Sequence, residues 1–484
     1  MRLHLLFSNR LFLTASLASL LCGPAKAQPF SNLHSFAGDP SPEGAYPSAG
    51  LVLFGSTLFG TTDWAGVDLG GGTIFKINTD GTGFEVIYSF SPGDPPRGLV
   101  HTNVDGSAPS TRLVLSGATL YGTTRTGGQS ANGTVFRINI DGSNFGILHD
   151  FSAVDASALT NADGARPEVP LVLSGDTLYG GTCEGGSYGG GTVFKIKTDG
   201  TEFATLHSFS ALSNYPDTFA WTNADGNFPV GLTLSSGTLY GTTMQGGLAG
   251  RGVVFKVNTD GSGFAVVHNF SGTDLSFPLA PPALLGRTLY GSTYAGGAYN
   301  YGGLFKVNTD GTGLTCLHSF NGADGSDPRA GLTLWGDILF GTTFEGGGYG
   351  RGSVFKLRTD GTGFANLYSF PARSAGALPK SGPLVLSDGS LYGTTLRGGK
   401  SDVGTVFRLL VDLEPPRLRL TCDGLRVVLE WPALPAGYRL QAATMLGSGG
   451  DWQDVPDPPI EADGLNRVEI SASRSSRFFR LRKN

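Results

Sequence analysis

The stretch that decides the fold is Thr177-Leu178-Tyr179-Gly180-Gly181-Thr182, followed by Gly191-Thr192-Val193-Phe194-Lys195-Ile196 and by Phe203-Ala204-Thr205-Leu206-His207-Ser208-Phe209. β-branched and aromatic residues fill these runs, and turn signals such as Asp199-Gly200 separate them, so each run predicts a short strand. Variants of the unit recur seven times, at spacings of 50 to 62 residues. A repeat of this length made only of strands is typical of a β-propeller. The aromatic residue of the first motif falls at Phe59, Tyr121, Tyr179, Tyr240, Tyr290, Phe340 and Tyr392.

Each repeat predicts four strands, named here a to d in chain order. A d-like strand at 30–36 precedes every other strand, and the last a–b–c set, 384–409, has no d strand after it. Pairing of the first strand with 404–409 would therefore complete the last sheet and remove the open edges of the array. The sequence predicts an all-β chain, a seven-bladed β-propeller closed by its N-terminal strand.

The chain divides into four predicted segments. Residues 1–27 read as a signal peptide, with Arg2 and Arg10 before a short apolar run and Ala25-Lys26-Ala27 as the cleavage site. Residues 28–411 form the propeller, and 412–416 form a linker. Residues 417–484 carry further strand patterns and resemble a fibronectin III-like β-sandwich, with Trp431 expected in its core. We therefore expect an exported protein, extracellular, on the cell surface or periplasmic.

Composition excludes several classes of function. The chain has 34 Lys and Arg against 39 Asp and Glu, a net charge of −5, and cleavage after residue 27 would make it more acidic. An acidic chain without a basic run argues against nucleic acid as a partner. The apolar run of residues 11–21 is too short to span a bilayer, and no second hydrophobic helix follows it. Of the four cysteines, the three that would remain after this cleavage, Cys183, Cys316 and Cys422, are scattered and do not suggest a disulfide framework. We expect a monomer without a transmembrane segment.

The L-Y-G-T-T, G-G and G-T-V-F motifs resemble the GloVer-type tandem repeat of exported bacterial proteins, the "choice-of-anchor" group. The resemblance covers roughly residues 30 to 410, with seven copies in agreement. It implies export and a repeat β-architecture, and it implies no activity. The C-terminus departs from the group, because residues 478–484 lack the hydrophobic tail of a surface anchor.

The loops between b and c and between d and the next a fall on one rim, which is the candidate binding face. The three longest d–a loops are consecutive, and each contains Thr-Asn-x-Asp-Gly. These loops would form a polar site for a glycan. Ca²⁺ is the weaker alternative, because one Asp per loop supplies few of the six to eight oxygen ligands that calcium takes. The alternatives are simple Asx turns and, for the aromatics, packing between blades. The candidate ligand-binding residues are Asn103, Asp105, Asn161, Asp163, Trp221, Asn223 and Asp225 in the long loops, and Trp64, Tyr294 and Phe344 in the b–c loops.

The sequence predicts a non-catalytic protein that binds a polysaccharide or a surface protein through this rim, without a cofactor. The a strands, expected to line the channel, carry no carboxylate or histidine, and the recurring histidines of the d strands are too far apart for a metal site. The alternative is a carbohydrate-active enzyme, a glycosidase or a lyase, with its site on the same rim. Its candidate residues are Arg125, Glu168, Glu184 and Arg397.

Overall fold

The computed structural model describes residues 29–38, 41–64, 70–92, 102–214, 221–380, 382–413, 416–423, 426–433, 438–444, 451–462, 465–471 and 477–483. The predicted signal peptide lies outside these residues. Within them the fold is all-β and propeller-like: no α-helix is formed, and η2 (Arg373–Ala375) is one turn of 3-10 helix. In the parts described, no helix is long and apolar enough to cross a membrane.

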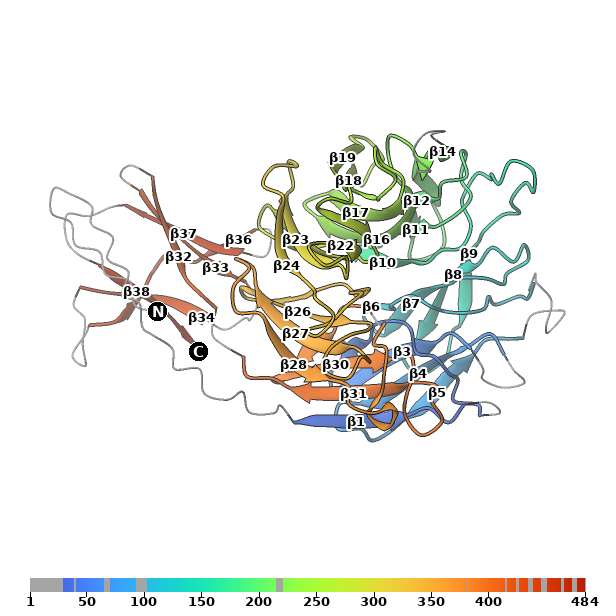
Figure 1. The fold of residues 1–484 in the computed structure, drawn as a ribbon, viewed down its shortest axis with the longest axis horizontal. Coiled ribbons are helices and arrows are strands. Elements are labelled where there is room, and N and C mark those ends of the chain that lie inside the picture. The colour runs from blue at the N-terminus through green and yellow to red at the C-terminus, as the bar shows by residue number, and fades with distance from the viewer. Residues whose placement is uncertain are drawn as a thin grey trace.

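The repeats form seven antiparallel sheets among the described residues (Figure 1). In five of them the strands follow one another in chain order, in the fifth sheet the first two strands both pair with the third, and the last sheet also contains the N-terminal strand. The strands are β2 (Val52–Phe54), β3 (Thr57–Thr62), β4 (Thr73–Asn78) and β5 (Glu85–Ser89); β6 (Val114–Ser116), β7 (Thr119–Thr124), β8 (Thr134–Asn139) and β9 (Gly146–Asp150); β10 (Val169–Ser174), β11 (Thr177–Thr182), β12 (Thr192–Lys197) and β13 (Ala204–Ser208); β16 (Asn227–Ser235), β17 (Thr238–Gln245), β18 (Val253–Asn258) and β19 (Ala265–Asn269); β20 (Leu275–Pro278), β21 (Ala283–Leu285), β22 (Thr288–Gly296), β23 (Gly303–Asn308) and β24 (Thr315–Ser319); β25 (Thr333–Trp335), β26 (Ile338–Thr343), β27 (Ser353–Arg358) and β28 (Ala365–Ser369); and β29 (Val385–Ser387), β30 (Ser390–Thr395) and β31 (Thr405–Leu410). A separate pair of short strands, β14 (Ser213–Asn214) and β15 (Trp221–Thr222), lies in the third long loop.

Close packing between strands explains why the repeat motif is so constant. Gly180 of β11 lies opposite Phe194 of β12, and a Cβ built on Gly180 would lie 2.6 Å from the tip of that ring. The fully buried phenylalanine therefore requires a glycine across from it. The same pair recurs in every repeat, so L-Y-G-T-T and G-T-V-F are two halves of one packing unit.

The N-terminal strand completes the last repeat sheet, as the sequence predicts. β1 (Phe30–Ser35) pairs antiparallel with β31, with Phe30 opposite Leu409 and Ser35 opposite Thr405. The ring of Phe30 stacks on Tyr368 of the preceding sheet with centroids 4.1 Å apart. The two ends of the repeat array are therefore joined by hydrogen bonds.

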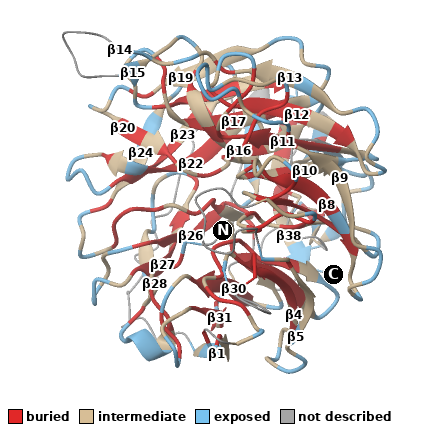
Figure 2. Cartoon of the chain, turned by 90° about the vertical axis from the view of Figure 1, so that its right-hand side faces the viewer, coloured by how far each residue is buried: buried red, intermediate tan, exposed pale blue. Residues whose placement is uncertain are grey.

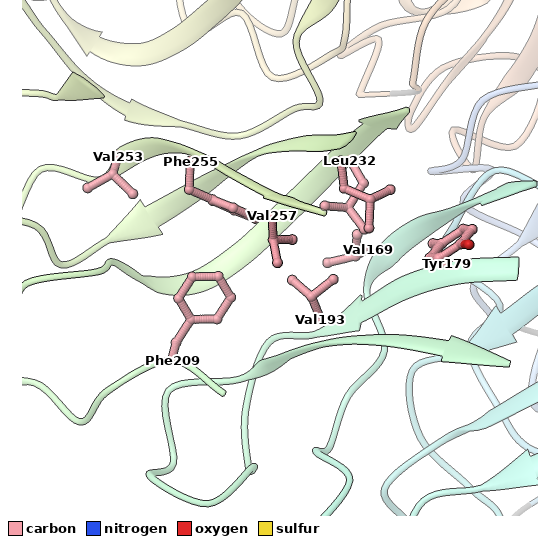
Figure 3. Packing of buried hydrophobic residues seen from close by; sticks show 9 residues of the cluster. Val169, Tyr179, Val193, Phe209, Leu232, Val253, Phe255 and Val257 are labelled. Carbon is pink, nitrogen blue, oxygen red and sulfur yellow. The ribbon is translucent and has the colours of Figure 1, made fainter. Parts of the chain in front are cut away.

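The hydrophobic core is divided between neighbouring sheets. One cluster places Val193 and Phe209 against Phe255 and Val257 of the next sheet (Figure 3). Six further clusters among the described residues join the other consecutive pairs, and one of them joins the last sheet to the first. The strands are buried on both faces because each sheet is covered twice, and exposed residues gather in the loops (Figure 2).

The C-terminal residues form two further sheets beside the repeats (Figure 1). One buried cluster draws Leu429 and Trp431 from the first sheet and Leu440 and Phe479 from the second. Trp431 is 1% exposed, in agreement with its predicted core position. Strand β36 was not predicted, and the expected linker 412–416 lies partly outside the described residues. The two sheets contain β32 (Arg419–Asp423), β33 (Arg426–Pro432), β37 (Leu465–Ser471) and β36 (Ile460–Ala462), and β35 (Gln453–Asp454), β34 (Tyr438–Ala443) and β38 (Phe478–Lys483).

Candidate functional site

A residue before a proline adopts the left-handed conformation once in every repeat. Backbone in this region is unfavourable for side chains other than glycine, and more so before proline, so the surroundings must hold it in place. The amide of Arg166, for example, donates to the carbonyl of Asn132 in the preceding repeat (2.9 Å), and that of Asp327 to Tyr301 (3.0 Å). These seven residues, with φ between 56° and 62°, are Tyr46, Ala108, Arg166, Phe228, Phe277, Asp327 and Leu378.

The residues after these prolines surround one central cavity of about 260 Å³. All seven line it, so equivalent positions of the repeats converge on one space. Those of the first, second, third, sixth and seventh repeats are polar or charged, including Glu168 and Lys380, whereas those of the fourth and fifth are apolar. The seven residues are Ser48, Ser110, Glu168, Val230, Leu279, Arg329 and Lys380.

A second cavity of about 480 Å³, called here the rim pocket, shares Lys380 with the central cavity. It combines four cationic side chains with two aromatic rings, and Trp64 is 52% exposed. Its walls come from the first, second, third and seventh repeats, which are neighbours because the last sheet packs on the first. The lining residues are Tyr46, Asp63, Trp64, Ala108, Arg125, Thr126, Arg166, Lys380, Leu396 and Arg397.

The four cations of the rim pocket differ in their partners. Arg125 pairs with Glu168 (2.7 Å) and Arg166 with Glu184 (2.9 Å). Arg397 instead lies over the ring of Tyr46, with its guanidinium carbon 4.7 Å from the ring centroid. Among the described residues, no carboxylate forms a salt bridge with Arg397 or Lys380. These two groups are available to an anion.

Asp63 is the one acidic residue that lines the rim pocket. Its carboxylate accepts a hydrogen bond from the hydroxyl of Ser48 (2.5 Å). Burial raises the pKa of Asp63, while the hydrogen bond from Ser48 and the nearby Lys380 and Arg125 act in the opposite direction. The net effect is a pKa of Asp63 above the usual value for an aspartate.

Two predicted aromatic residues lie beside Arg329, which lines the central cavity. The guanidinium of Arg329 lies 3.9 Å from the ring centroid of Phe344 and 5.6 Å from that of Tyr294. Asp327 accepts from the same guanidinium at 2.5 and 2.8 Å. Phe344 is 8% exposed and Tyr294 42% exposed. Phe344 is thus covered by Arg329, whereas Tyr294 keeps an open face.

The three asparagines of the long loops bind their own backbone. The side-chain oxygen of Asn161 accepts from the amides of Gly164 (2.9 Å) and Gly186 (2.8 Å). Its amide group donates to the carbonyls of Ser152 (3.0 Å) and Gly164 (2.8 Å). Asn103 and Asn223 make the same set of bonds. Each asparagine therefore joins a d–a loop to the b–c loop of its own repeat.

The aspartates of the same motif pair with the d strands. Asp163 accepts from His149 (2.9 Å) and from the amide and hydroxyl of Ser152. Asp225 accepts from His207, and Asp105 from Tyr88. Burial would raise the pKa of Asp163, but the hydrogen bonds from His149 and Ser152 outweigh it and lower the pKa. Pairs of the same kind in the shorter loops are His34–Glu43, His268–Asp274 and His318–Asp324.

Of the ten predicted site residues, Trp64 alone lines the rim pocket. Trp221 is 56% exposed on β15 in the third long loop. Sequence reasoning noted Arg125 and Arg397 on the rim but missed Tyr46, Arg166 and Lys380. These three residues could have been found from the sequence, because each lies beside the proline of the x-Pro-x motif that recurs in every repeat. No group of three His, Cys, Asp or Glu in the described part of the chain is placed to hold a metal ion.

Comparison with known families identifies the repeat. The model of the Gloeobacter/Verrucomicrobia repeat matches residues 23–160, 101–281 and 230–414. The chain belongs to this repeat family. This Gloeobacter/Verrucomicrobia repeat protein matches no curated protein sequence.

Solved structures similar to this repeat protein have low sequence identity to it. An oligogalacturonate lyase in complex with manganese is 9% identical, with a TM-score of 0.44, over 80% of this chain and 94% of that one. TolB from Acinetobacter baumannii is 11% identical, with a TM-score of 0.33, over 60% and 58%. A nidogen/laminin complex matches at 14% identity and a TM-score of 0.36, over 66% and 96%.

Proposed function

We propose that residues 28–411 form a seven-bladed β-propeller closed by β1, and that 417–484 form a β-sandwich-like module after a short linker. The pairing of β1 with β31 and the cluster joining the last sheet to the first support closure. The central cavity, lined by one residue from each of seven repeats, supports the blade number. The buried cluster shared by the two C-terminal sheets supports the second module. Residues 1–27 would direct export and be removed.

We infer that this protein binds an acidic glycan, without catalysis, in the rim pocket. The observation that carries the inference is the meeting of Trp64 and Tyr46 with Arg397 and Lys380 in one cavity of about 480 Å³. An exposed aromatic ring offers a flat apolar face for a sugar ring. A guanidinium and an ammonium without carboxylate partners would bind the carboxylates or sulfates of the same sugar chain.

The size and charge of the pocket suit a short segment of a sugar chain. Its volume lies within the range of about 300–1,000 Å³ that is usual for small-molecule sites. The acidic protein would repel a polyanion elsewhere on its surface, so the local cations would fix where such a glycan binds. The ligand would be a segment of a polysaccharide at the cell exterior, and its binding would require neither a cofactor nor a metal ion.

In this proposal the polar residues of the long loops support the site without contacting the ligand. Asn103, Asn161 and Asn223 and the neighbouring aspartates would hold the loop shape, because their polar groups bond to backbone and to the d strands. Trp221 and Tyr294 keep exposed faces and would contact a glycan that extends beyond the pocket.

The test is titration of the full mature chain with an oligomer of three uronic acids and, separately, of three glucose units, followed by calorimetry. The proposal expects saturable binding of the acidic oligomer, at least tenfold stronger than of the neutral one. Equal affinities, or no binding of either oligomer, would refute the acidic glycan as ligand. Measurement of the acidic oligomer's reducing ends over time separates binding from cleavage.

A carbohydrate-active enzyme is the second candidate, and one observation favours it. Asp63, whose pKa is raised mainly by burial, lines the rim pocket, and Glu168, which is paired with Arg125, lines the adjoining central cavity. A carboxyl group with a raised pKa near a second carboxylate fits the pattern of a general acid and a base. Cleavage of the acidic oligomer by the wild-type protein and its loss in Asp63→Asn would establish this function in place of simple binding.

A further inference from the structure

A large apolar cavity lies at the end of the molecule opposite the rim pocket. It has a volume of about 890 Å³, and leucines of six a strands line it together with prolines. Arg112 is the only charged side chain among its described lining residues. The cavity is called here the apolar chamber. The leucines that line it from within the strands are Leu53, Leu115, Leu171, Leu173, Leu232, Leu234, Leu284, Leu285 and Leu334.

Arg112 lies where the apolar chamber meets the central cavity. It lines both spaces, as do Pro170, Pro281 and Pro383. The prolines supply no amide donors, so the guanidinium is the strongest donor at this junction. The lining therefore changes from charged residues in the central cavity to leucines in the apolar chamber, with Arg112 at the boundary.

The charge of Arg112 is not compensated within the described residues. Its Nε donates to the carbonyl of Leu51 (3.0 Å), and the two terminal nitrogens have no hydrogen-bond acceptor among the described residues. No carboxylate of the described chain forms a salt bridge with it, and burial lowers the pKa of Arg112. A partly buried cation without an anion is costly, and a bound anion would offset that cost.

The C-terminal module lies at the edge of the chamber. Pro432, the last residue of β33, lines the chamber. Arg417 approaches Asp337 (3.4 Å) beside the sixth repeat, and Leu465 packs on the cluster that contains Leu285. The module therefore borders the chamber.

We propose that the apolar chamber binds a long-chain carboxylate, with the carboxylate on Arg112 and the alkyl chain among the leucines. This site is separate from the rim pocket and does not depend on the glycan proposal. A mostly apolar cavity with one convergent polar group is the usual form of a small-molecule site. The terminal nitrogens of Arg112 match the two oxygens of a carboxylate, and a neutral lipid would leave the cation unpaired.

The test is calorimetric titration of the mature chain with octanoate, decanoate and dodecanoate below their micelle concentrations. Each added CH₂ should strengthen binding about three- to fourfold, because each buries apolar surface in the chamber. Dodecyltrimethylammonium, which has the same chain and the opposite charge, should bind at least tenfold more weakly. Absence of binding by the folded protein, or affinity independent of chain length, would overturn the proposal.

Variants separate the two parts of the site. Arg112→Gln should weaken dodecanoate binding at least tenfold, and Arg112→Lys should restore part of it, because the charge returns without the fork of donors. Arg287→Gln is the matched control, since Arg287 is exposed in the turn after β21. Leu173→Trp should weaken binding of dodecanoate more than of octanoate by filling the chamber. Equal affinities in wild type, Arg112→Gln and Leu173→Trp would contradict the assignment.

Discussion

The guanidinium of Arg397 lies over the ring of Tyr46, 4.7 Å from its centroid, with Nη1 3.4 Å from the phenol oxygen. Arg397 belongs to the last repeat and Tyr46 to the first, so this contact crosses the join between the two ends of the array. The join is completed by the amide of Tyr46, which donates to the carbonyl of Val403 (2.8 Å). The rim pocket thus depends on closure: without it, Arg397 and Lys380 would not face Tyr46 and Trp64.

Arg397→Ala should weaken binding of an acidic oligosaccharide about tenfold or more, because it removes a cation that has no carboxylate partner in the described protein. Arg251→Ala is the matched control, since Arg251 lies 5.1 Å from the ring centroid of Phe277 in a different sector of the same rim. Calorimetry on the two variants measures the difference. Similar losses in both would mean that the ligand does not occupy the rim pocket.

Trp64→Ala should abolish most of the glycan affinity, while Trp221→Ala should reduce it little. The two indoles are similarly exposed, at 52% and 56%, but only Trp64 lines the pocket with cations beside it. Stacking on an exposed indole also predicts a change in its fluorescence on titration, which Trp64→Ala should remove. A larger loss in Trp221→Ala would move the site to the third long loop.

Asn161→Ala should lower stability and leave the glycan affinity of the folded protein unchanged. The side chain makes four hydrogen bonds to backbone groups, and its removal leaves the amides of Gly164 and Gly186 without that acceptor. We expect a loss of about 1–3 kcal/mol in the free energy of unfolding, measured with urea. If the variant folded fully but lost its affinity for the glycan, Asn161 would contact the ligand directly.

The repeat motif predicted the strands because its chemistry is local. Phe194 needs a glycine opposite it, and the unpaired set at 384–409 needs a further strand, so periodicity alone predicted that β1 pairs with β31. The rim pocket is not local. Tyr46 and Arg166 precede the proline of the repeated x-Pro-x motif and Lys380 follows it, in three different repeats, yet only the meeting of the last repeat with the first brings them together. The burial of Phe344 is non-local for a related reason, since Arg329 covers its ring from another segment and leaves it 8% exposed.

Phe36→Ala should destabilise the protein by about 3–5 kcal/mol, the usual cost of removing a buried phenylalanine. Phe36 is fully buried, its ring lies 5.3 Å from that of Phe75, and its amide donates to Gly404 (3.2 Å). It therefore holds the N-terminal segment against both the first and the last sheets. Phe54→Ala, at a residue 44% exposed, is the control and should cost much less. Equal urea midpoints for the two variants would show that the N-terminal segment does not close the array.

Stability should rise with pH in the window below the ordinary histidine pKa of about 6.5. Burial lowers the pKa of His34 and His318 in the folded protein, and Glu43 and Asp324 only partly offset it. Between the folded and unfolded pKa values the unfolded chain binds more protons, so the free energy of unfolding increases with pH and then levels off above about 6.5. Urea unfolding from pH 5 to 8 measures this slope, and a His34→Gln, His318→Gln double variant should flatten it. A slope that persists unchanged in that variant would assign the effect to other groups.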